Sequence, residues 1–285
     1  MPELPEVEFC RRCLTRWTKG RRVVEADVPD PRSVRASRTH RPTQGHPDGV
    51  SELRAVVLSA PPGPVLRHGK RLLWRFGDNA LLLHLGMTGK WSRTPTPYVK
   101  VRLSLDDGTA LHFCDPRLLG GVVPTTWDDG RALLADGLGP DAYDAPLPAL
   151  RGGRPVKLAL MDQSFVAGLG NVQAMEALWR AHIHPATPCD ALTDAQRAAL
   201  PVAVRAQLDA TLALFDDADE IVYVEEDRSA NPFPVYRHAG EPCPACGTPI
   251  ARMVQGGRST YWCPGCQPET VPPRPPKPRK NAPRT

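Results

Sequence analysis

The chain has 285 residues, a length that suits about two domains. Hydrophobic residues make up 41% and charged residues 24%, which excludes global disorder, and no apolar run approaches the roughly 18 residues that a membrane helix needs. The net charge of +5 permits a polyanionic partner without proving one. The N-terminus, MPELPEVEFCRR, is acidic where a secretion signal is basic, so we expect a cytoplasmic, reducing location.

The first half of the chain reads as one helix followed by strands. Residues 3–19 suit a short helix, and the proline-rich stretch 28–47 reads as a long loop. Strand-like segments follow: RLLWRF, ALLLHLGM, VKVRLSL and TALHFC. The separators GDN and DDG are hairpin signals. A mostly β domain is therefore predicted as far as about residue 125.

The second half is helical and ends in a cysteine-rich piece. After the break PLPALRGGRP, helical periodicity covers residues 156–184 and 193–215. The last 19 residues hold seven prolines and five Lys or Arg, which predicts a disordered tail that could also serve as a weak electrostatic arm for nucleic acid. We therefore divide the chain into a β domain at 1–146, a helical domain at 147–235, a metal module at 236–267 and a tail at 268–285.

Two CxxC pairs form the metal module: Cys243 with Cys246, and Cys263 with Cys266, with 16 residues between the pairs. Each pair places two thiolates on one side of a tight turn, and two such turns complete a tetrahedral four-sulfur shell. In a reducing compartment this spacing predicts one structural Zn²⁺ rather than redox pairs. Metal binding should supply most of the folding energy of so short a module.

The stretch between the pairs reads as strand, Gly-Gly turn, strand, with Arg258 directly after the turn. A guanidinium on a rigid hairpin tip can pair bidentately with phosphate. From the residues alone, a solvated arginine is an equal alternative.

Pro2 follows the initiator methionine, and a small second residue suits removal of that methionine. The prolyl amine would then be free, and an α-amine has a pKa of about 7.7–8.0. Its neutral form can attack an aldehyde-like sugar carbon and form an iminium. Glu3 beside it could donate or relay protons. On its own such a terminus is weak evidence for an enzyme.

Five motifs occur in a fixed order along nearly the whole chain: MPELPEVE at the start, HLGMTG at 84–89, DPR at 115–117, DQSFVAGLGN at 162–171 and GRSTYWCPGCQ in the metal module. Together they resemble the formamidopyrimidine-DNA glycosylase/endonuclease VIII family. The resemblance implies an α+β multidomain fold: an N-terminal β-sandwich flanked by helices, a helix–two-turn–helix domain and a C-terminal zinc-finger β-hairpin. It also implies that damaged double-stranded DNA lies in the cleft between the halves.

The resemblance assigns catalytic roles to matching residues. Pro2 corresponds to the nucleophile that attacks C1′ of the damaged nucleotide, and Glu3 to the acid/base that assists base loss and sugar-ring opening. Lys70 corresponds to a hairpin lysine that contacts phosphate and supports β-elimination. Arg258 corresponds to the zinc-hairpin arginine that grips phosphate around the lesion and is linked to δ-elimination.

Further residues correspond to contacts with DNA. Asn171 matches a phosphate-binding asparagine, and Gly168 and Gly170 would let backbone N–H groups approach a phosphate. Met87 matches a methionine inserted into the gap that a flipped nucleotide leaves. Arg117 of the DPR motif is included in this set.

The chain departs from the family at four places. Leu118 and Leu119 follow DPR where the first kind of enzyme in the family has Arg and Phe, so no guanidinium can pair with the orphaned base there. Lys100 stands where a DNA-contacting histidine is frequent, and Gln173 where a tyrosine is expected. The acidic stretch 216–243 lacks a glycine-rich loop that caps the lesion. The lesion preference is therefore open.

We expect a monomeric, bifunctional DNA glycosylase and abasic-site lyase of base excision repair, cytoplasmic and associated with the nucleoid. It would remove oxidised or ring-opened bases and cut the strand by elimination. The alternatives are a catalytically silent relative that binds damaged DNA, and an endonuclease VIII-like enzyme that prefers oxidised pyrimidines. A zinc-ribbon protein of transcription or RNA handling is a third hypothesis, and the N-terminal and GLGN motifs speak against it.

Overall fold

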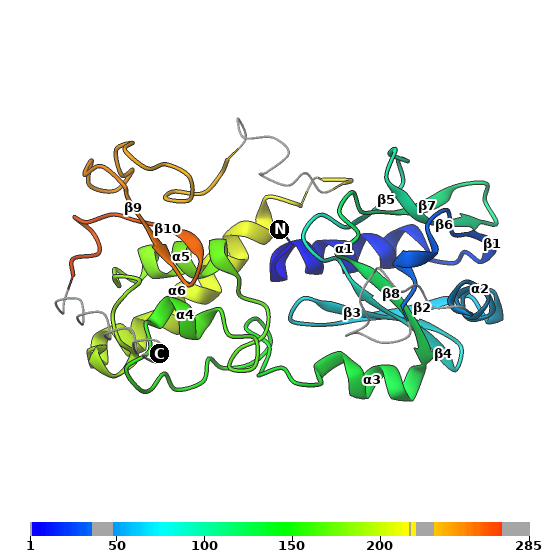
Figure 1. Cartoon of the computed structure of the whole chain (residues 1–285), viewed down its shortest axis with the longest axis horizontal. Coiled ribbons are helices and arrows are strands. Elements are labelled where there is room, and N and C mark those ends of the chain that lie inside the picture. Colours follow the sequence, from blue (N-terminus) through cyan, green and yellow to red (C-terminus); the bar gives the residue numbers. More distant parts are fainter. Residues whose placement is uncertain (1, 36–47, 217, 221–230, 270–285) are drawn as a thin grey trace, which may run out of the picture.

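The computed structural model has two halves that lie side by side, and the N-terminal end of helix α1 (Leu4–Trp17) lies at their junction (Figure 1). The structure describes residues 2–35, 48–216, 218–220 and 231–269. The predicted tail from residue 270 onward lies outside these ranges, as do residues 221–230 of the acidic stretch. Within the described ranges, no helix combines the length and apolar character needed to cross a membrane.

The first half is a sandwich of two four-stranded antiparallel sheets. One sheet has the order β1-β6-β7-β5 and the other β2-β3-β4-β8. The strands of the first sheet are β1 (Val23–Asp27), β6 (Val99–Leu105), β7 (Ala110–Cys114) and β5 (Lys90–Ser92). Those of the second sheet are β2 (Pro62–His68), β3 (Arg71–Phe76), β4 (Asn79–His84) and β8 (Gly121–Thr126).

The continuous apolar runs of β3 and β4 arise because both faces of the second sheet are covered. Leu72 and Trp74 point into the core between the sheets, where the Trp74 ring packs edge-on against Trp91. Leu73, which lies between them in the chain, points to the opposite face and joins a second cluster with Leu134 of α3 (Trp127–Ala135). Alternate side chains of one strand therefore enter two different cores.

Two helices of this half, α2 (Gly49–Ser59) and α3, were not predicted from the residue pattern. The prediction of strands as far as residue 125 is wrong for α2, whose Leu53, Val56 and Val57 are buried in the core. Their i, i+3, i+4 spacing is helical. The 3-10 turn η1 (Pro31–Ser33) precedes the stretch 36–47, which lies outside the described residues.

The second half contains three helices among its described residues: α4 (Val156–Leu160), α5 (Asn171–Arg180) and α6 (Asp194–Ala213), with the 3-10 turn η3 (Cys189–Ala191) before α6. The predicted helical stretch 156–184 is thus two helices, and the loop between them carries the GLGN motif. Leu4 of α1 is fully buried in the core of this half. The domain boundary at residue 146 stays a prediction, but the packing of the second half already includes the start of the chain.

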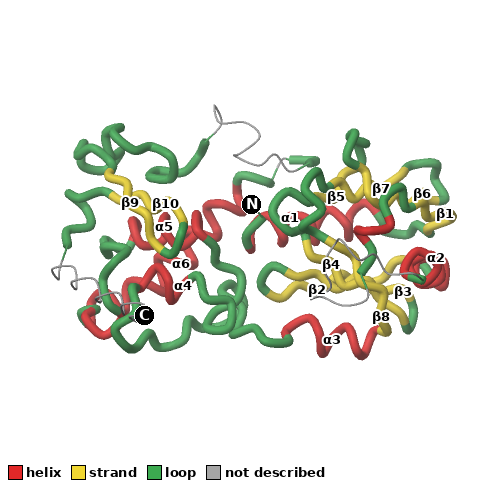
Figure 2. The backbone as a smooth tube through the Cα atoms, in the orientation of Figure 1, coloured by secondary structure: helices red, strands yellow, loops and turns green. Residues whose placement is uncertain are grey.

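The metal module is a two-stranded antiparallel hairpin, β9 (Ala251–Gln255) with β10 (Arg258–Trp262), that lies beside α5 (Figure 2). Gly256 and Gly257 form its tip with φ of +58° and +74°, a backbone conformation that favours glycine. Tyr261 donates its backbone N–H to the sulfur of Met175 in α5, at 3.1 Å. The hairpin is therefore fastened to the helical half.

Candidate active site and nucleic-acid interface

Glu3 joins the start of α1 to the start of α5. Its side chain is 2% exposed, and its carboxylate accepts three backbone N–H groups. Oε2 accepts from Gly170 at 2.8 Å and from Gln173 at 3.1 Å, and Oε1 accepts from Val172 at 2.9 Å. The unpaired N–H groups of a helix N-terminus stabilise an anion at that position. Glu3 is therefore a fixed hydrogen-bond acceptor where the two halves of the molecule meet.

Glu6 lies one turn further along α1 and completes a capping box with Glu3. The backbone N–H of Glu3 donates to Glu6 Oε2 at 2.8 Å. Burial, with the nearby charge of Glu3 as a second cause, raises the pKa of Glu6 to about 7. Glu6 therefore retains a proton over much of the range up to neutral pH, beside a carboxylate that accepts only.

The N–H groups of Gly168 and Gly170, which were predicted to approach a phosphate, have acceptors within the protein. Gly170 donates to Glu3, and Gly168 donates to Gln163 Oε1 at 3.1 Å. These glycines instead permit close packing. A side chain at Gly170 would overlap the Glu3 carboxylate, and one at Gly168, where φ is +110°, would overlap Leu4.

Lys70 reaches across the seam from the first half. It follows Gly69, whose φ of +54° closes the tight turn between β2 and β3. The Lys70 ammonium donates to the carbonyl oxygen of Leu169, in the GLGN loop, at 2.9 Å. Burial lowers the pKa of Lys70, and the positive charge of Arg258 contributes to this decrease. The structure thus brings Lys70 into the same site as Glu3.

Lys157 was not identified from the sequence, although its side chain connects α4 to α5 and to the zinc hairpin. It is fully buried in α4, and its ammonium donates to Asn171 Oδ1 at 2.7 Å and to Thr260 Oγ1 at 2.6 Å. Asn171 in turn donates to the carbonyl oxygen of Ser259 at 3.1 Å. Burial lowers the pKa of Lys157 to about 8, with Arg258 as a further cause. We call Glu3, Lys70, Lys157, Asn171 and Arg258 the polar seam.

Arg258 is exposed at the tip of the zinc hairpin, and the tip itself is anchored. A side chain at Gly256 would overlap Leu158 of α4. The Gln255 amide donates to the carbonyl oxygen of Pro185 at 3.1 Å. These contacts hold the hairpin tip against α4, and the charge of Arg258 acts on Lys157 of that helix.

The four cysteines of the module meet as the spacing predicted. The Sγ atoms of Cys243, Cys246, Cys263 and Cys266 lie within 4.8 Å of one another. Tetrahedral zinc with Zn–S bonds of about 2.3 Å requires sulfur separations of about 3.8 Å, so the cluster fits this metal. All four corners are protein ligands, which suits a structural site.

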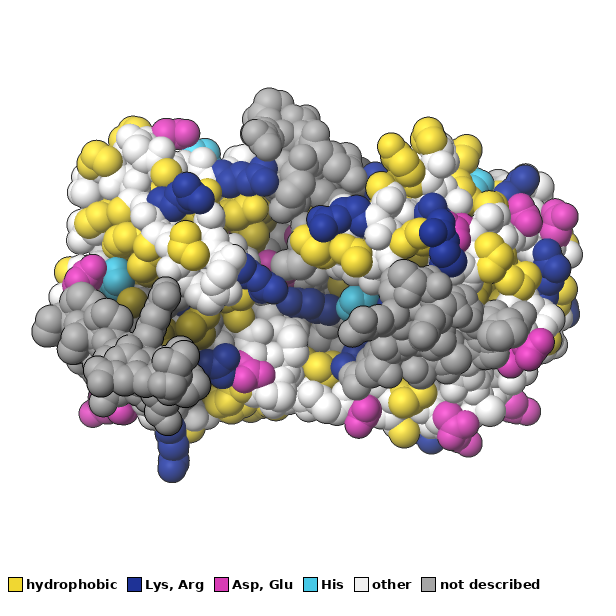
Figure 3. Space-filling model, in the orientation of Figure 1, with side chains coloured by type: hydrophobic (Ala, Val, Ile, Leu, Met, Phe, Trp, Pro, Cys, Tyr) yellow, Lys and Arg dark blue, Asp and Glu magenta, His cyan; other side chains and the backbone are white. Residues whose placement is uncertain are grey.

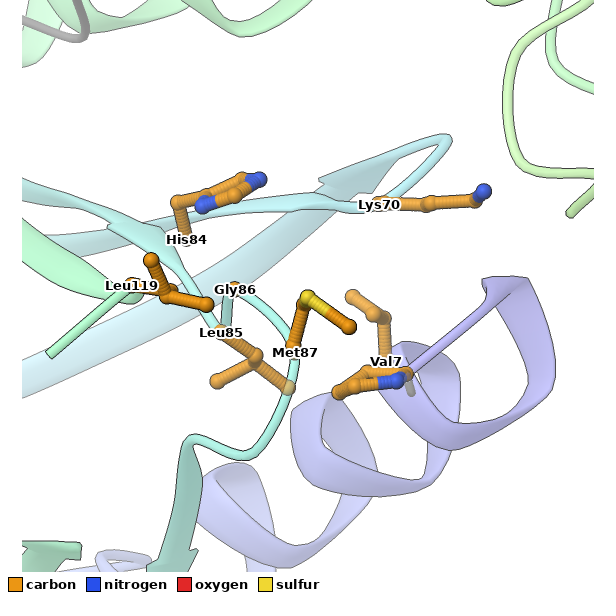
Figure 4. A pocket seen from close by; sticks show the side chains of 8 residues that line it. Val7, Lys70, His84, Leu85, Gly86, Met87 and Leu119 are labelled. Carbon is orange, nitrogen blue, oxygen red and sulfur yellow. The ribbon is translucent and has the colours of Figure 1, made fainter. Parts of the chain in front are cut away.

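A cavity of about 320 Å³ opens beside the seam. Figure 4 shows Lys70, Met87 and Val7 along one part of it and Leu119 and His84 along another. Its lining residues are Pro2, Val7, Lys70, His84, Leu85, Gly86, Met87 and Leu119. We call Met87 and Leu119, together with Leu118 that precedes Leu119 in the chain, the apolar rim.

Two predicted residues, Lys100 and Arg117, and Gln173, which stands where the family has a tyrosine, lie apart from the seam or have internal partners. Lys100 forms an ion pair with Asp30 at 3.3 Å, and Arg117 is exposed in the turn before the rim. Gln173 is buried, and its Oε1 accepts hydrogen bonds from Gln207 and Thr211. Gln173 therefore belongs to the interior of the helical half and does not face the cavity.

Space-filling Figure 3 shows Lys and Arg side chains in the hollow between the two halves. A basic hollow at a junction attracts a polyanion, and the bulk charge of the chain favours the same partner only weakly.

Three family models match the chain in order. They are the formamidopyrimidine-DNA glycosylase N-terminal domain at residues 1–122, the formamidopyrimidine-DNA glycosylase H2TH domain at 149–219, and a zinc finger found in FPG and IleRS at 240–268. A formamidopyrimidine-DNA glycosylase of Salinispora arenicola is 36% identical, with 94% of this chain and 96% of the relative covered. One from Streptomyces avermitilis is 37% identical, with 94% and 98% covered.

Solved structures agree with these matches. The crystal structure of the MutM (Fpg) protein from Thermus thermophilus superposes with a TM-score of 0.74 at 33% identity, covering 93% of this chain and 98% of that one. A complex of Lactococcus lactis Fpg with DNA containing an abasic site has a TM-score of 0.79 at 25% identity, covering 94% and 100%.

The matches extend over all three parts of the chain and define a DNA glycosylase of base excision repair whose cysteine cluster holds a structural zinc. With more than a third of its residues identical over 94% of its length, the chain belongs to the formamidopyrimidine-DNA glycosylase family.

Proposed function

We propose that the enzyme is bifunctional: it removes a damaged base and then cleaves the DNA strand as an abasic-site lyase. After removal of Met1, the secondary amine of Pro2 attacks C1′ of the flipped nucleotide, and the bond from C1′ to the base breaks. The base leaves with the electron pair of that bond and takes up a proton. The Pro2 nitrogen then loses its proton, the bond from C1′ to the ring oxygen breaks, the ring oxygen takes up a proton, and the nitrogen lone pair completes an iminium between C1′ and Pro2. The observation that supports this proposal is the presence of Pro2 and Lys70 on one cavity beside Glu3.

The two carboxyl groups at the start of α1 have separate roles in this proposal. Glu3 accepts three N–H groups and stabilises positive charge that develops on the sugar and on Pro2. Glu6, whose pKa is about 7, stores a proton within the same helical turn. The iminium then acidifies the hydrogen on C2′, and its loss with departure of the 3′ phosphate breaks the strand.

Damaged double-stranded DNA is the proposed partner, held mainly through its backbone. The charge of Arg258 acts on Lys70, and Asn171 is bonded to Lys157, on which Arg258 also acts, so these residues can offer neighbouring contacts to phosphates. Lys100 and Arg117 extend these contacts, and Met87 with Leu119 occupies the gap left by the flipped nucleotide. We further propose that the enzyme acts as a monomer in the cytoplasm, close to the nucleoid.

The proposed substrates are oxidised or ring-opened bases, with abasic sites and formamidopyrimidines preferred. The apolar rim offers no charged group to an orphaned base, so recognition depends on weakened stacking and pairing at the lesion.

Borohydride trapping on an abasic duplex tests the proposal against a silent DNA binder. A lyase gives a covalent protein–DNA adduct in the presence of borohydride and a cleaved strand without it. Tight binding with neither product would establish the silent binder. A parallel assay on oxidised pyrimidines tests the endonuclease VIII-like alternative.

A further inference from the structure

The turn that carries Leu119 has a strained backbone. Leu118 adopts φ +52°, a left-handed conformation that costs an ordinary residue about 1–2 kcal/mol. Such a residue persists only where its surroundings determine the conformation, and these positions cluster at functional sites. The contacts that fix this turn therefore identify residues that serve it.

Asp115 fixes the turn because its carboxylate accepts hydrogen bonds from backbone N–H groups of the turn. Its carboxylate is fully buried, and Oδ2 accepts the backbone N–H of Gly120 at 2.7 Å. Oδ1 accepts the N–H of Arg117 at 3.2 Å and the hydroxyl of Thr88 at 2.7 Å. Because Thr88 follows Met87, the same carboxylate ties the Met87 loop to this turn.

Arg35 fixes the turn because its guanidinium donates hydrogen bonds to backbone carbonyl groups of the turn. Its guanidinium Nη2 donates to the carbonyl oxygens of Leu118, at 3.3 Å, and of Gly120. Its backbone N–H donates to the carbonyl oxygen of Val122 at 2.9 Å, which fixes the start of the side chain. Arg35 is 8% exposed, so its guanidinium is directed into the protein and away from solvent. A side chain at Gly121 would overlap it.

The Met87 loop and the Leu119 turn also touch directly. A side chain at Gly86 would overlap the backbone of Leu119 and Gly120. With polar groups of both loops bonded inward, Met87 and Leu119 stay 38% and 37% exposed. The two loops of the apolar rim are thus packed together, with Met87 and Leu119 lining the cavity.

We propose that Arg35 is a positioning residue that fixes the Leu118–Gly120 turn and so keeps Met87 and Leu119 together as one rigid apolar wedge. This rests on the proposed insertion of Met87 and Leu119 into the DNA duplex. The wedge serves the opening of the base stack, and the reaction at Pro2 does not require it. Loss of Arg35 therefore impairs reaction at duplex lesions and spares the chemistry on DNA that has no stack to open.

The test uses Arg35→Gln, with Arg35→Lys as the conservative variant and Arg131→Gln, an exposed arginine on α3, as the matched control. Excision from a duplex lesion should slow about tenfold in Arg35→Gln, the effect expected for loss of hydrogen bonds from a charged donor. Cleavage of an abasic site in single-stranded DNA should stay within about twofold of wild type. Arg35→Lys, which keeps one donor group, should fall between, and Arg131→Gln should match wild type.

A fluorescent base reports the wedge itself. In a duplex with 2-aminopurine beside an uncleavable tetrahydrofuran site, wild-type binding should raise the fluorescence by unstacking, and Arg35→Gln should raise it less at saturation. Gly121→Ala should reproduce this defect by displacing the guanidinium, and it keeps the assignment testable if Arg35→Gln folds poorly.

Equal losses of activity on duplex and single-stranded substrates would overturn the role of Arg35. Full activity on duplex DNA in both Arg35→Gln and Gly121→Ala would also overturn it. Leu119→Ala separates this outcome from failure of the insertion proposal. If Leu119→Ala leaves duplex excision and fluorescence unchanged, the wedge is wrong. If it impairs both while Arg35→Gln does not, only the positioning role is wrong.

Discussion

Lys70 of the polar seam and Met87 and Leu119 of the apolar rim line the same cavity, but the seam and the rim are built in different ways. Groups of the seam come from both halves and from the zinc hairpin, and most of them are bonded to partners far away in the chain, as Lys157 is to Thr260. The rim belongs to the first half alone, and its turn is closed both by the nearby Asp115 and by Arg35, which lies 83 residues before Leu118. Chemistry that needs fixed charges therefore depends on the whole assembly, whereas duplex opening depends on two loops of the first half and on Arg35.

The largest expected effect is at the seam. Glu3→Gln should slow base excision about 10²- to 10⁴-fold, since a neutral amide stabilises positive charge poorly and cannot accept N–H groups at both of its ends. Single-turnover rates on a duplex lesion measure this effect. Glu25→Gln, on the exposed side of β1, is the control and should be unaffected. A Glu3→Gln rate within threefold of wild type would remove Glu3 from the mechanism.

Next in size is the dependence of the seam on zinc. Cys243→Ser should lose the metal and, with it, about 10²-fold in affinity for an abasic-site analogue, because the hairpin that positions Arg258 is stabilised by the metal. Elemental analysis and binding titration measure the two quantities. Cys114→Ser, in β7, is the cysteine control. Metal loss with unchanged affinity would show that Arg258 does not need the hairpin.

A third prediction concerns Glu176 of α5, which holds the segment that precedes the zinc module. It is fully buried, and its Oε1 accepts the N–H groups of Val235 and Tyr236 at 3.1 and 2.8 Å. Its Oε2 has no hydrogen-bond partner within the described part of the chain, which suits a protonated carboxyl. Burial raises its pKa from 4.5 to about 7.

The sign of the pH effect follows from this increase. The folded state binds the proton more tightly than the unfolded state, so the stabilisation is complete below pH 4.5 and is lost as the pH rises toward 7. The loss amounts to about 3 kcal/mol in the free energy of unfolding. Urea unfolding at several pH values should therefore show a flatter profile for Glu176→Gln than for wild type. Parallel profiles would mean that Glu176 is ionised throughout.

The smallest expected effect concerns the rim and the ranking of lesions. With Leu118 and Leu119 after the DPR motif, reaction on abasic sites and formamidopyrimidines should exceed that on 8-oxoguanine opposite cytosine by about tenfold, or about 1.4 kcal/mol. Rates on duplexes of one sequence decide this point. If 8-oxoguanine is the fastest of the three, the rim recognises more than an apolar surface can.

Local patterns predicted the parts of the site that are local. The paired cysteines identified the metal site because two cysteines separated by two residues lie on the same side of a tight turn and can bind one metal together. Four strands of the sandwich, β3, β4, β6 and β7, and helix α6 followed from periodicity in the same way. Helix α2 was missed because its apolar residues follow a long loop and precede strands. A short apolar run alone does not distinguish a helix from a strand.

Roles that depend on distant contacts were not predictable from spacing. Glu3 lies 167 residues before Gly170, so nothing near GLGN indicated that its N–H groups already have an acceptor. Lys157 reads as an ordinary helical lysine until the hairpin places Thr260 beside it. Arg35 likewise reads as a loop arginine, and only the fold places it beneath the Leu118 turn.

The amine of Pro2, which lines the cavity, is the proposed nucleophile of this enzyme. Peptide mass mapping of the adduct formed with an abasic duplex and borohydride identifies the attacking amine. We expect the reduced adduct on Pro2. Lys157 and Lys70 are the competing amines, since burial lowers the pKa of both. An adduct on either lysine in the wild-type enzyme would rule out Pro2 as the nucleophile.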